Sequence, residues 1–193
     1  MAQSILGFNN LDEFFAFHAA PALAGIKPAS LFSCPANLMP QADKVLAAYN
    51  RQFKARGTNF KLLCRCRSHI LILVYDEKLL AQVLQRQISQ NYLKRCGYDK
   101  NVSTEEFLNV LAAKISAGGE FPHEIGIALG YPPEDIEGFK RYKGRNFKCC
   151  GYWKVYGNAE RAQKLFDAYT LCRDKLMRAL QTGATLKVAA AAI

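Results

Sequence analysis

Residues 60–75 read FKLLCRCRSHILILVY, and this stretch decides the fold class. Over 60–67 every second residue is apolar and basic residues stand between most of them, a pattern typical of a β-strand with one buried face. The run at 70–75 is apolar at every position, as in a central strand that is buried on both faces. Ser68 and His69 separate the two runs, so we expect the two strands to form a hairpin.

Helical patterns lie on both sides of this hairpin. The spacing of apolar residues predicts amphipathic helices after Asn10, over 41–56, over 77–92, after Ser103, over 123–129, over 133–142 and after Asn158. Two further short strands are expected, over 30–34 and over 152–156. This order is typical of an α+β protein, in which a small mixed β-sheet of about four strands is covered by amphipathic helices.

The two ends of the chain carry further signals. Asn10 followed by Glu13 is a capping pair that predicts the start of the first helix. Pro21 is expected to end that helix, because proline lacks the N–H that a helix interior needs. We expect a single domain over 1–187 and a frayed, alanine-rich tail over 188–193.

Composition limits the class of protein. The chain has 193 residues, of which 50% are hydrophobic, and its formal net charge is +10. This length suits one domain and is enough to bury a core without disulfide bonds. The composition excludes a disordered chain, a collagen and a coiled coil. The positive charge favours an anionic partner, but it does not choose between nucleic acid, phosphorylated small molecules and an acidic protein.

The compartment is predicted from what the sequence lacks. No apolar run approaches the roughly 18 residues of a membrane span, so we expect no membrane partner. Residues 1–10 have no basic region before an apolar stretch, so we expect no signal peptide. The seven cysteines are an odd number without a Cys-x-x-Cys motif, which favours a cytoplasmic protein with reduced thiols. Cys64 and Cys66 are expected in the core, and the spacing of metal ligands that zinc requires is absent.

The first candidate site is HAAPALAGIKPASLF at 18–32. It places His18 at a helix end and Lys27 in a loop stiffened by proline. Such a loop can hold a lysine and backbone N–H groups toward an anion. The alternative is that His18 belongs to the core, because it shares a helix face with apolar residues and buried histidines commonly bond backbone carbonyls.

The second candidate site is EFPHEIGIALGYPPEDIEGF at 120–139, where His123 and Glu124 stand at a predicted helix start. A neutral imidazole beside a carboxylate can perform acid–base chemistry. Adjacent residues on a helix do not face each other, however, so the two side chains need not share a target. The alternative is a capped helix with a surface histidine.

The same stretch also resembles a helix-turn-helix over 124–142. Two glycines four residues apart are followed by 133–142, which would be the recognition helix. Its outward residues would be Glu134, Asp135 and Glu137, an acidic face that is unfavourable beside phosphates. A helical hairpin used only for packing explains the same spacing.

The third candidate site is the segment 140–156, where basic and aromatic residues are interleaved without an acidic residue between Glu137 and Glu160. Such a segment can bind a nucleotide or a single strand through charge and stacking. The alternative is a solvated loop followed by a half-buried strand. The basic residues are Lys140, Arg141, Lys143, Arg145, Lys148 and Lys154, and the aromatic ones are Tyr142, Phe147, Tyr152, Trp153 and Tyr156.

Three stretches, 18–32, 121–139 and GYWKVYGNAERAQKLF at 151–166, together resemble the bacterial family called domain of unknown function 3793. The resemblance covers Leu11 to Cys172. It implies a small soluble protein and brings no activity, cofactor or partner with it. The family pattern falls on His18, Pro21, Gly25, Lys27, Pro28, Phe121, His123, Glu124, Gly130, Tyr131, Gly144, Trp153, Lys154 and Tyr156, and Ala22 stands where the pattern has threonine.

We therefore expect the motifs at 18–32, 121–131 and 144–156 to form one pocket for an anionic small molecule or cofactor whose identity the sequence does not give. The predicted ligand-binding residues are His18, Lys27, Tyr131, Arg145, Lys154 and Tyr156. His123 and Glu124 are the acid–base candidates for a catalysed reaction, and no metal ligands are predicted. One alternative is a nucleic-acid-binding module that uses the basic segment 140–154, and another is a protein-interaction subunit without a pocket.

Overall fold

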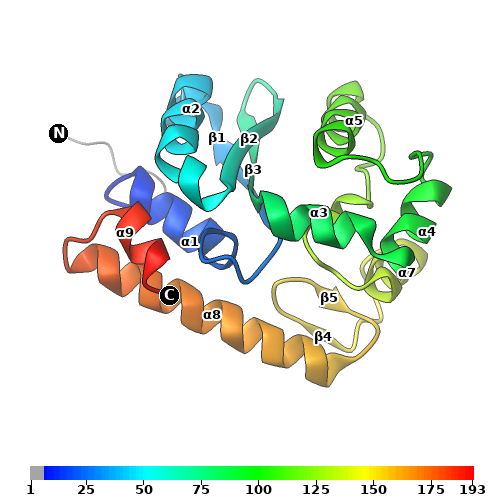
Figure 1. Cartoon of the computed structure of the whole chain (residues 1–193). Helices are drawn as coiled ribbons and strands as arrows, with labels where there is room; N and C mark the ends of the chain where they lie inside the picture. Colours follow the sequence, from blue (N-terminus) through cyan, green and yellow to red (C-terminus); the bar gives the residue numbers. More distant parts are fainter. Residues whose placement is uncertain (1–6) are drawn as a thin grey trace. The chain divides into compact units, whose positions relative to one another are not determined.

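The computed structural model describes residues 7–193 and divides them into two compact units (Figure 1). The first unit comprises residues 7–77 and 169–193, and the second comprises residues 78–168. Helices and strands are both present, and the strands gather in one small sheet and one short ribbon. The predicted α+β class is therefore confirmed.

The first unit contains a three-stranded antiparallel sheet. Its strands are β1 (Ala29–Pro35), β2 (Thr58–Arg65) and β3 (His69–Asp76), in the order β1-β3-β2. The central position of β3 and its hairpin with β2 are as predicted. The sheet is antiparallel and not mixed, because β3 lies between β1 and β2 and keeps these two strands, which run in the same direction, from pairing.

A β-bulge in β2 overturns the prediction for two cysteines. Leu62 pairs with Ile72, but Cys64 already pairs with Leu71, so one extra residue is inserted between them. Because side chains alternate across a strand, the insertion moves every later residue to the opposite face. Leu63 is therefore the buried residue, whereas Cys64 is half-buried and Cys66 is exposed. The prediction that these two cysteines lie in the core is wrong.

Helices α1 (Leu11–Leu23) and α2 (Ala42–Phe53) supply most of the core beside the sheet. The side chain of Asn10 caps α1 by accepting the backbone N–H of Glu13 at 2.9 Å, as predicted. Pro21 does not end α1, which continues for two more residues. Proline removes only one backbone donor, and burial of Leu23 favours keeping the last turn.

Two short 3₁₀ helices connect these elements, Ala36–Leu38 after β1 and Lys54–Arg56 after α2. Of the tail predicted to fray, 188–193, residues 188–191 belong to α9 (Leu186–Ala191), which is capped by Thr185. Leu186, Ala189 and Ala190 of this helix are buried in the core cluster that also contains residues of α1. The small alanine side chains allow α9 to approach α1 closely, and this contact explains the difference from the prediction.

The second unit is mostly helical (Figure 1). The helix predicted over 77–92 is two helices, because the backbone leaves the helical region at Arg86 with φ −63° and ψ 135°. The strand predicted over 152–156 is one half of a ribbon in which Cys149 pairs with Val155. The elements are α3 (Glu77–Gln85), α4 (Gln87–Arg95), α5 (Thr104–Ala117), α6 (Ile125–Ala128), α7 (Pro133–Tyr142), β4 (Cys149–Cys150), β5 (Lys154–Val155) and the first part of α8 (Ala159–Gln181).

The caps of the second unit agree with the sequence. Ser103 accepts the N–H of Glu106 at the start of α5, and Asn158 accepts the N–H of Arg161 at the start of α8. Pro133 occupies the first turn of α7, where its missing N–H is no loss. Among the helices within residues 7–193, none combines the length and the apolar character that crossing a bilayer requires.

Candidate functional site

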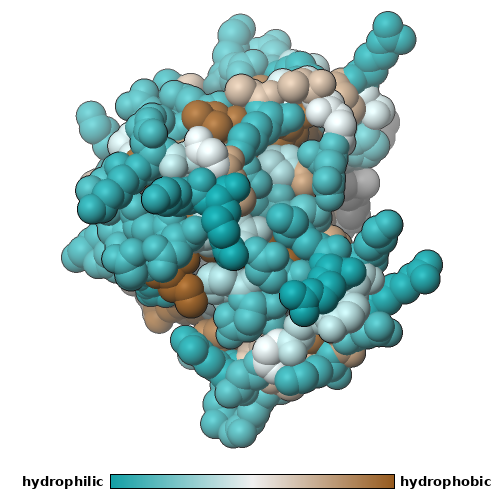
Figure 2. All heavy atoms as spheres, turned by 90° about the vertical axis from the view of Figure 1, so that its right-hand side faces the viewer, coloured by the Kyte–Doolittle hydropathy of each residue, from teal (hydrophilic) through white to brown (hydrophobic). Residues whose placement is uncertain are grey.

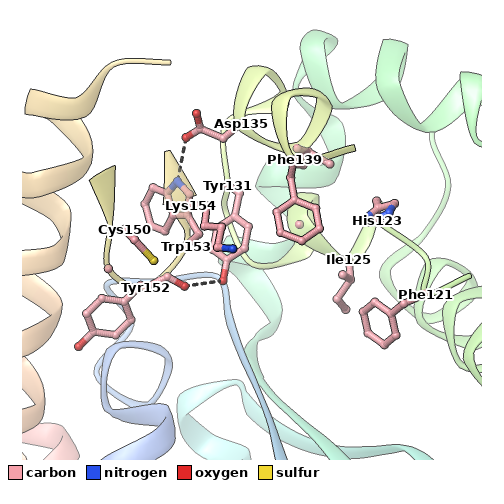
Figure 3. Close-up of a pocket in the computed structure, with 13 residues that line it drawn as sticks. Phe121, His123, Ile125, Tyr131, Asp135, Phe139, Cys150, Tyr152, Trp153 and Lys154 are labelled. Atoms are coloured by element: carbon pink, nitrogen blue, oxygen red, sulfur yellow. Dashed lines mark hydrogen bonds between the residues drawn. The ribbon is translucent and has the colours of Figure 1, made fainter. Parts of the chain in front are cut away.

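A pocket of about 410 Å³ lies within the second unit (Figure 3). Its walls come from the turn before α6 together with α6 itself, from Tyr131 and α7, and from the β4–β5 ribbon. Small-molecule sites are typically concave and mostly apolar, with volumes of roughly 300–1,000 Å³. The pocket matches this description, because most of its lining side chains are apolar or aromatic: Phe121, Ile125, Tyr131, Ile136, Phe139, Tyr152 and Trp153.

A stacked pair of rings forms one wall. The rings of Tyr131 and Trp153 are 4.8 Å apart and inclined by 29°. The Tyr131 hydroxyl donates to the carbonyl oxygen of Tyr152 at 3.2 Å, so the tyrosine is held at both its ring and its hydroxyl. In Figure 3 the ring of Phe139 lies between this pair and the group formed by His123 and Ile125. The wall is thus a flat aromatic surface that faces further apolar groups.

Asp135 fixes the position of the indole in this wall. Its Oδ2 accepts the Trp153 Nε1–H at 2.8 Å, and its Oδ1 accepts the backbone N–H groups of Tyr156 and Gly157 at 2.7 Å each. The side chain is buried, and a buried carboxylate requires donors of this kind. Asp135 also lies in the first turn of α7, where the partial positive charge of the helix dipole stabilises its carboxylate.

This role of Asp135 was missed by the sequence interpretation. The helix-turn-helix alternative placed Asp135 on an outward face, and that placement is wrong, because only 3% of the residue is exposed. The sequence feature that could have indicated this role is the pair of glycines at positions 138 and 157. A Cβ at Gly138 would lie 2.3 Å from Tyr156 Cγ, and a Cβ at Gly157 would lie 2.7 Å from Glu134 Cγ. Glycine at both positions lets the segment after β5 approach α7 closely enough to donate to Asp135.

Lys154 places a cation among the aromatic groups of the pocket. Its Nζ donates to the carbonyl oxygen of Gly144 at 2.8 Å, and it lies 5.1 Å from the ring centre of Phe147 and 6.0 Å from that of Phe139. An ammonium group has three N–H donors, so the bond to Gly144 uses only one of them. The predicted site residues Lys154, Tyr131 and His123 therefore line one pocket.

His123 stands at another wall of the pocket. Its side chain is 22% exposed, its Nε2 lies 3.2 Å from Glu120 Oε1, and its ring centre is 5.6 Å from that of Phe139. An ionised carboxylate only accepts hydrogen bonds, so Nε2–H is the donor in this contact. The arrangement orients the imidazole beside the pocket.

Glu124 does not line this pocket. Its Oε1 accepts from Lys114 Nζ at 2.6 Å and from the Tyr98 hydroxyl at 3.3 Å, and Lys114 also donates to the carbonyl oxygen of Cys96. Burial, followed by the Glu124 charge, raises the pKa of Tyr98. The carboxylate thus joins α5 to the turn before α6. The acid–base roles of His123 and Glu124 stay predictions.

A second hollow of about 400 Å³ lies beside this ion pair. It shares Phe121 and His123 with the aromatic pocket, so these two side chains border both spaces. Its other lining groups include Lys114, Glu124 and Lys140, and their charges partly cancel. Within the described residues, no group of three or more His, Cys, Asp or Glu side chains is placed to hold a metal ion.

The other predicted ligand-binding residues lie elsewhere. Tyr156 packs over Gly138 and stacks on Tyr142 with ring centres 5.8 Å apart, outside the lining of the pocket. Arg145 is exposed to solvent. His18 and Lys27 belong to the first unit. The ligand-binding roles of these four residues stay predictions.

His18 is surrounded by phenylalanine rings. It stacks on Phe32 with ring centres 5.1 Å apart, and the ring centre of Phe14 is 4.8 Å away. Burial lowers the pKa of His18, because the charged imidazolium loses solvation there. These surroundings are those expected if His18 is a core residue.

Lys27 is a buried amine in the first unit. Only 4% of the residue is exposed, and its Nζ lies 5.8 Å from the ring centre of Tyr169. Burial lowers the pKa of Lys27 to about 8. The loop that carries it is folded back on α1, because the N–H groups of Ile26 and Lys27 both donate to the carbonyl oxygen of Pro21.

The hydropathy of one face bears on the protein-interaction alternative. Figure 2 shows a largely hydrophilic face on which hydrophobic residues form small separate areas. Apolar interaction sites usually exceed a few hundred Å² of continuous surface. The face in Figure 2 does not present such a continuous patch.

Comparison with known proteins gives one match. A family model described as protein of unknown function (DUF3793) matches residues 15–189, which is most of the chain. Neither the curated proteins nor the solved structures contain a match to this sequence. The chemistry of the pocket therefore has to be argued from the pocket itself.

Proposed function

This chain belongs to the DUF3793 family, and from that premise we propose that the second unit binds a small molecule with a flat apolar body and one anionic group. The observation that carries the proposal is the ammonium group of Lys154 at the wall of a pocket otherwise lined mainly by aromatic and aliphatic side chains. The family contributes no ligand, so the argument rests on shape and charge.

The flat body of the ligand would stack on the Tyr131–Trp153 pair. Aromatic rings attract each other in offset stacks beyond the gain from burying their area. Asp135 holds the indole and the Tyr152 carbonyl holds the tyrosine hydroxyl. Because these rings are already ordered, binding loses little conformational entropy in this wall.

The anionic group would bond to Lys154. Two of its N–H donors remain after the bond to Gly144. The rings of Phe139 and Phe147 lie beside the half-buried ammonium, and a charge-assisted hydrogen bond gains strength in less polar surroundings. A bond of this type contributes about 1.5–3 kcal/mol.

The test compares 8-anilinonaphthalene-1-sulfonate with N-phenyl-1-naphthylamine, which has the same aromatic body but lacks the anionic sulfonate group. Trp153 is the only tryptophan of the chain, so energy transfer from its fluorescence reports binding at this wall. We expect both probes to quench Trp153 and the sulfonate to bind about 10- to 100-fold more tightly. Isothermal titration calorimetry supplies the two values of Kd.

The variant Lys154→Met should remove the preference for the sulfonate and leave the neutral probe unchanged. Lys143→Met is the matched control, because Lys143 is exposed and does not line the pocket. Equal binding of the two probes by the unaltered protein would overturn the anionic part of the proposal. If neither probe quenched Trp153, the proposal that this pocket binds a small molecule would be overturned. Circular dichroism checks that each variant is folded.

A further inference from the structure

The basic residues of 140–154 fall into two groups in the structure. Lys154 lines the pocket, whereas the cations of residues 140–148, here called the basic segment, are all exposed. None of them is in an ion pair with another residue of the described part, 7–193. The exposed cations are Lys140, Arg141, Lys143, Arg145 and Lys148.

The carboxylates nearest in sequence do not neutralise these cations. Glu137 pairs with Arg95 at 3.2 Å, and Glu160 pairs with Lys164 at 2.9 Å. Asp135 is buried and already accepts three N–H groups. Apart from Lys140, which shares the second hollow with Glu120 and Glu124, the basic segment therefore presents a positive charge that no nearby carboxylate neutralises, and such a charge attracts a polyanion.

The backbone of the basic segment is held in a defined shape. Helix α7 is followed by its C-cap Lys143 at φ 50° and by Gly144 at φ 73°, and Asn146 also has a positive φ of 55°. Hydrogen bonds fix these turns, among them Arg145 N–H to Tyr142 O at 2.9 Å and Lys148 N–H to Val155 O at 2.8 Å. Left-handed backbone is uncommon in lysine but ordinary at a helix C-cap, and asparagine adopts it readily, so these turns give the basic segment a fixed shape.

Two aromatic rings are exposed within the same segment. Tyr142 is 42% and Phe147 is 41% exposed. Tyr142 is already ordered, because its ring lies almost parallel to that of Tyr156, inclined by 16°. Nucleic-acid bases stack on exposed rings of this kind whatever their sequence, since every base has a π-face.

We infer that the basic segment is a binding surface for single-stranded nucleic acid, separate from the small-molecule pocket. The cations would bond to phosphates, and Tyr142 and Phe147 would each stack on a base. A duplex is a poorer partner, because reading its groove would use α7, which carries Glu134 and Glu137 on its accessible side. An anionic membrane is also a poorer partner, since two rings bury little apolar area.

The first experiment measures binding of the full chain to a fluorescein-labelled 15-nucleotide oligouridylate by fluorescence anisotropy. Five cations on a single strand give a slope of log K against log salt of at most about −3.5, from about −0.7 for each phosphate contact. We therefore expect affinity to fall by about a hundredfold between 50 and 200 mM salt. A duplex of the same length should bind more weakly.

Two variants separate charge from stacking. Arg145→Gln should reduce the magnitude of the salt slope by about 0.7. Tyr142→Ala should keep the slope and weaken binding by about 5- to 150-fold, the range for the loss of one stacked base. Arg178→Gln is the control, because this exposed arginine lies outside the basic segment.

The inference is overturned if the oligonucleotide does not bind at 50 mM salt. It is also overturned if Arg145→Gln and Tyr142→Ala both bind like the unaltered protein. Vesicles of phosphatidylserine and phosphatidylcholine provide the remaining comparison. Binding of vesicles but not of RNA, lost in Tyr142→Ala, would assign the basic segment to a membrane surface instead.

Discussion

The carboxylate of Asp135 and the indole of Trp153 share a hydrogen bond of 2.8 Å, and both side chains are buried. The same carboxylate binds the backbone just after β5. One side chain of α7 therefore holds both the ring that forms the pocket wall and the strand that carries it.

Asp135→Asn tests this anchor. The amide keeps one acceptor oxygen but turns an NH₂ group toward N–H donors, so at least one buried donor loses its partner. We expect the free energy of unfolding to fall by about 2–4 kcal/mol, since hydrogen bonds to charged groups contribute about 1.5–3 kcal/mol each. Urea unfolding followed by circular dichroism measures the loss, and Trp153 emission should shift to the red.

The matched control for Asp135→Asn is Glu134→Gln. Glu134 is exposed in the same helical turn, and surface changes of this type usually stay within about 0.5 kcal/mol. If Asp135→Asn were as stable as this control, the network of three N–H donors would not stabilise the fold.

Thiol reactivity should follow the face change caused by the bulge in β2. Cys66 is exposed, and hydrogen bonds from the Ser68 hydroxyl and then from the His69 backbone N–H lower its pKa. Burial raises the pKa of Cys34 and raises that of Cys172 to about 11. We expect iodoacetamide at pH 7.5 to alkylate Cys66 first, because the thiolate is the nucleophile.

A time course of peptide mass spectrometry measures these alkylation rates. Alkylation in urea is the control, and there the differences between the cysteines should largely disappear. Protection of Cys66 from alkylation in the folded protein would contradict the face change in β2.

The bulge shows why the strand could be predicted but its faces could not. The alternation from Phe60 onward correctly predicts β2, because period 2 places one side of a strand toward the core. Leu62 and Leu63 are both apolar, however, and either can fill the buried position. Only the pairing with β3 decides between them, and that information is not local to the strand.

The candidate site, like the faces of β2, could be predicted from local sequence only in part. Tyr131 and Lys154 could be singled out by residue type, since aromatic and basic groups in unusual motifs indicate binding. Asp135 could not, because an acidic residue in the first turn of a helix usually faces solvent and serves the helix dipole. Its burial depends on Gly157, which is 22 residues later in the chain and adjacent only after folding.

Stability should rise with pH because of Lys27. The pKa of Lys27 falls from 10.5 to about 8 in the folded chain. Between pH 8 and 10.5 the unfolded chain therefore binds more protons than the folded one, and linkage makes the folded state gain stability as pH rises. Below pH 8 the cost of burying the charge is present in full, at about 3 kcal/mol.

Lys27→Met removes this titration, so the free energy of unfolding of the variant should lack the rise between pH 8 and 10 that the unaltered protein shows. Guanidinium unfolding at pH 7, 8, 9 and 10 with a phosphine reductant measures it, and Lys44→Met on the exposed side of α2 is the control. An equal change with pH in the variant and in the unaltered protein would show that Lys27 does not titrate with a lowered pKa in the fold.

Gly138→Ala should reverse the usual effect of alanine in a helix. Alanine normally stabilises a helix interior by up to about 1 kcal/mol relative to glycine. Here its Cβ would lie 2.3 Å from Tyr156 Cγ, so we expect a loss of about 1–3 kcal/mol in the free energy of unfolding. Thermal unfolding followed by circular dichroism measures it.

Gly126→Ala is the control for this change. Its Cβ would meet Ile136 Cδ1 and Cγ1 at 2.8 Å, a less severe overlap than the 2.3 Å at Gly138, so a smaller loss is expected. A gain in stability from Gly138→Ala would mean that Tyr156 does not pack over α7 as described.

The first unit is assembled from two separate parts of the chain, residues 7–77 and 169–193. Leu176 and Leu186, which come from the later part, are buried in the core cluster of this unit. A ribosome releases residues 78–168 before it releases these leucines, and domains generally fold as units during synthesis. The second unit is therefore synthesised completely before the first. The core beside the sheet β1–β3 can be completed only after the last helices have been synthesised.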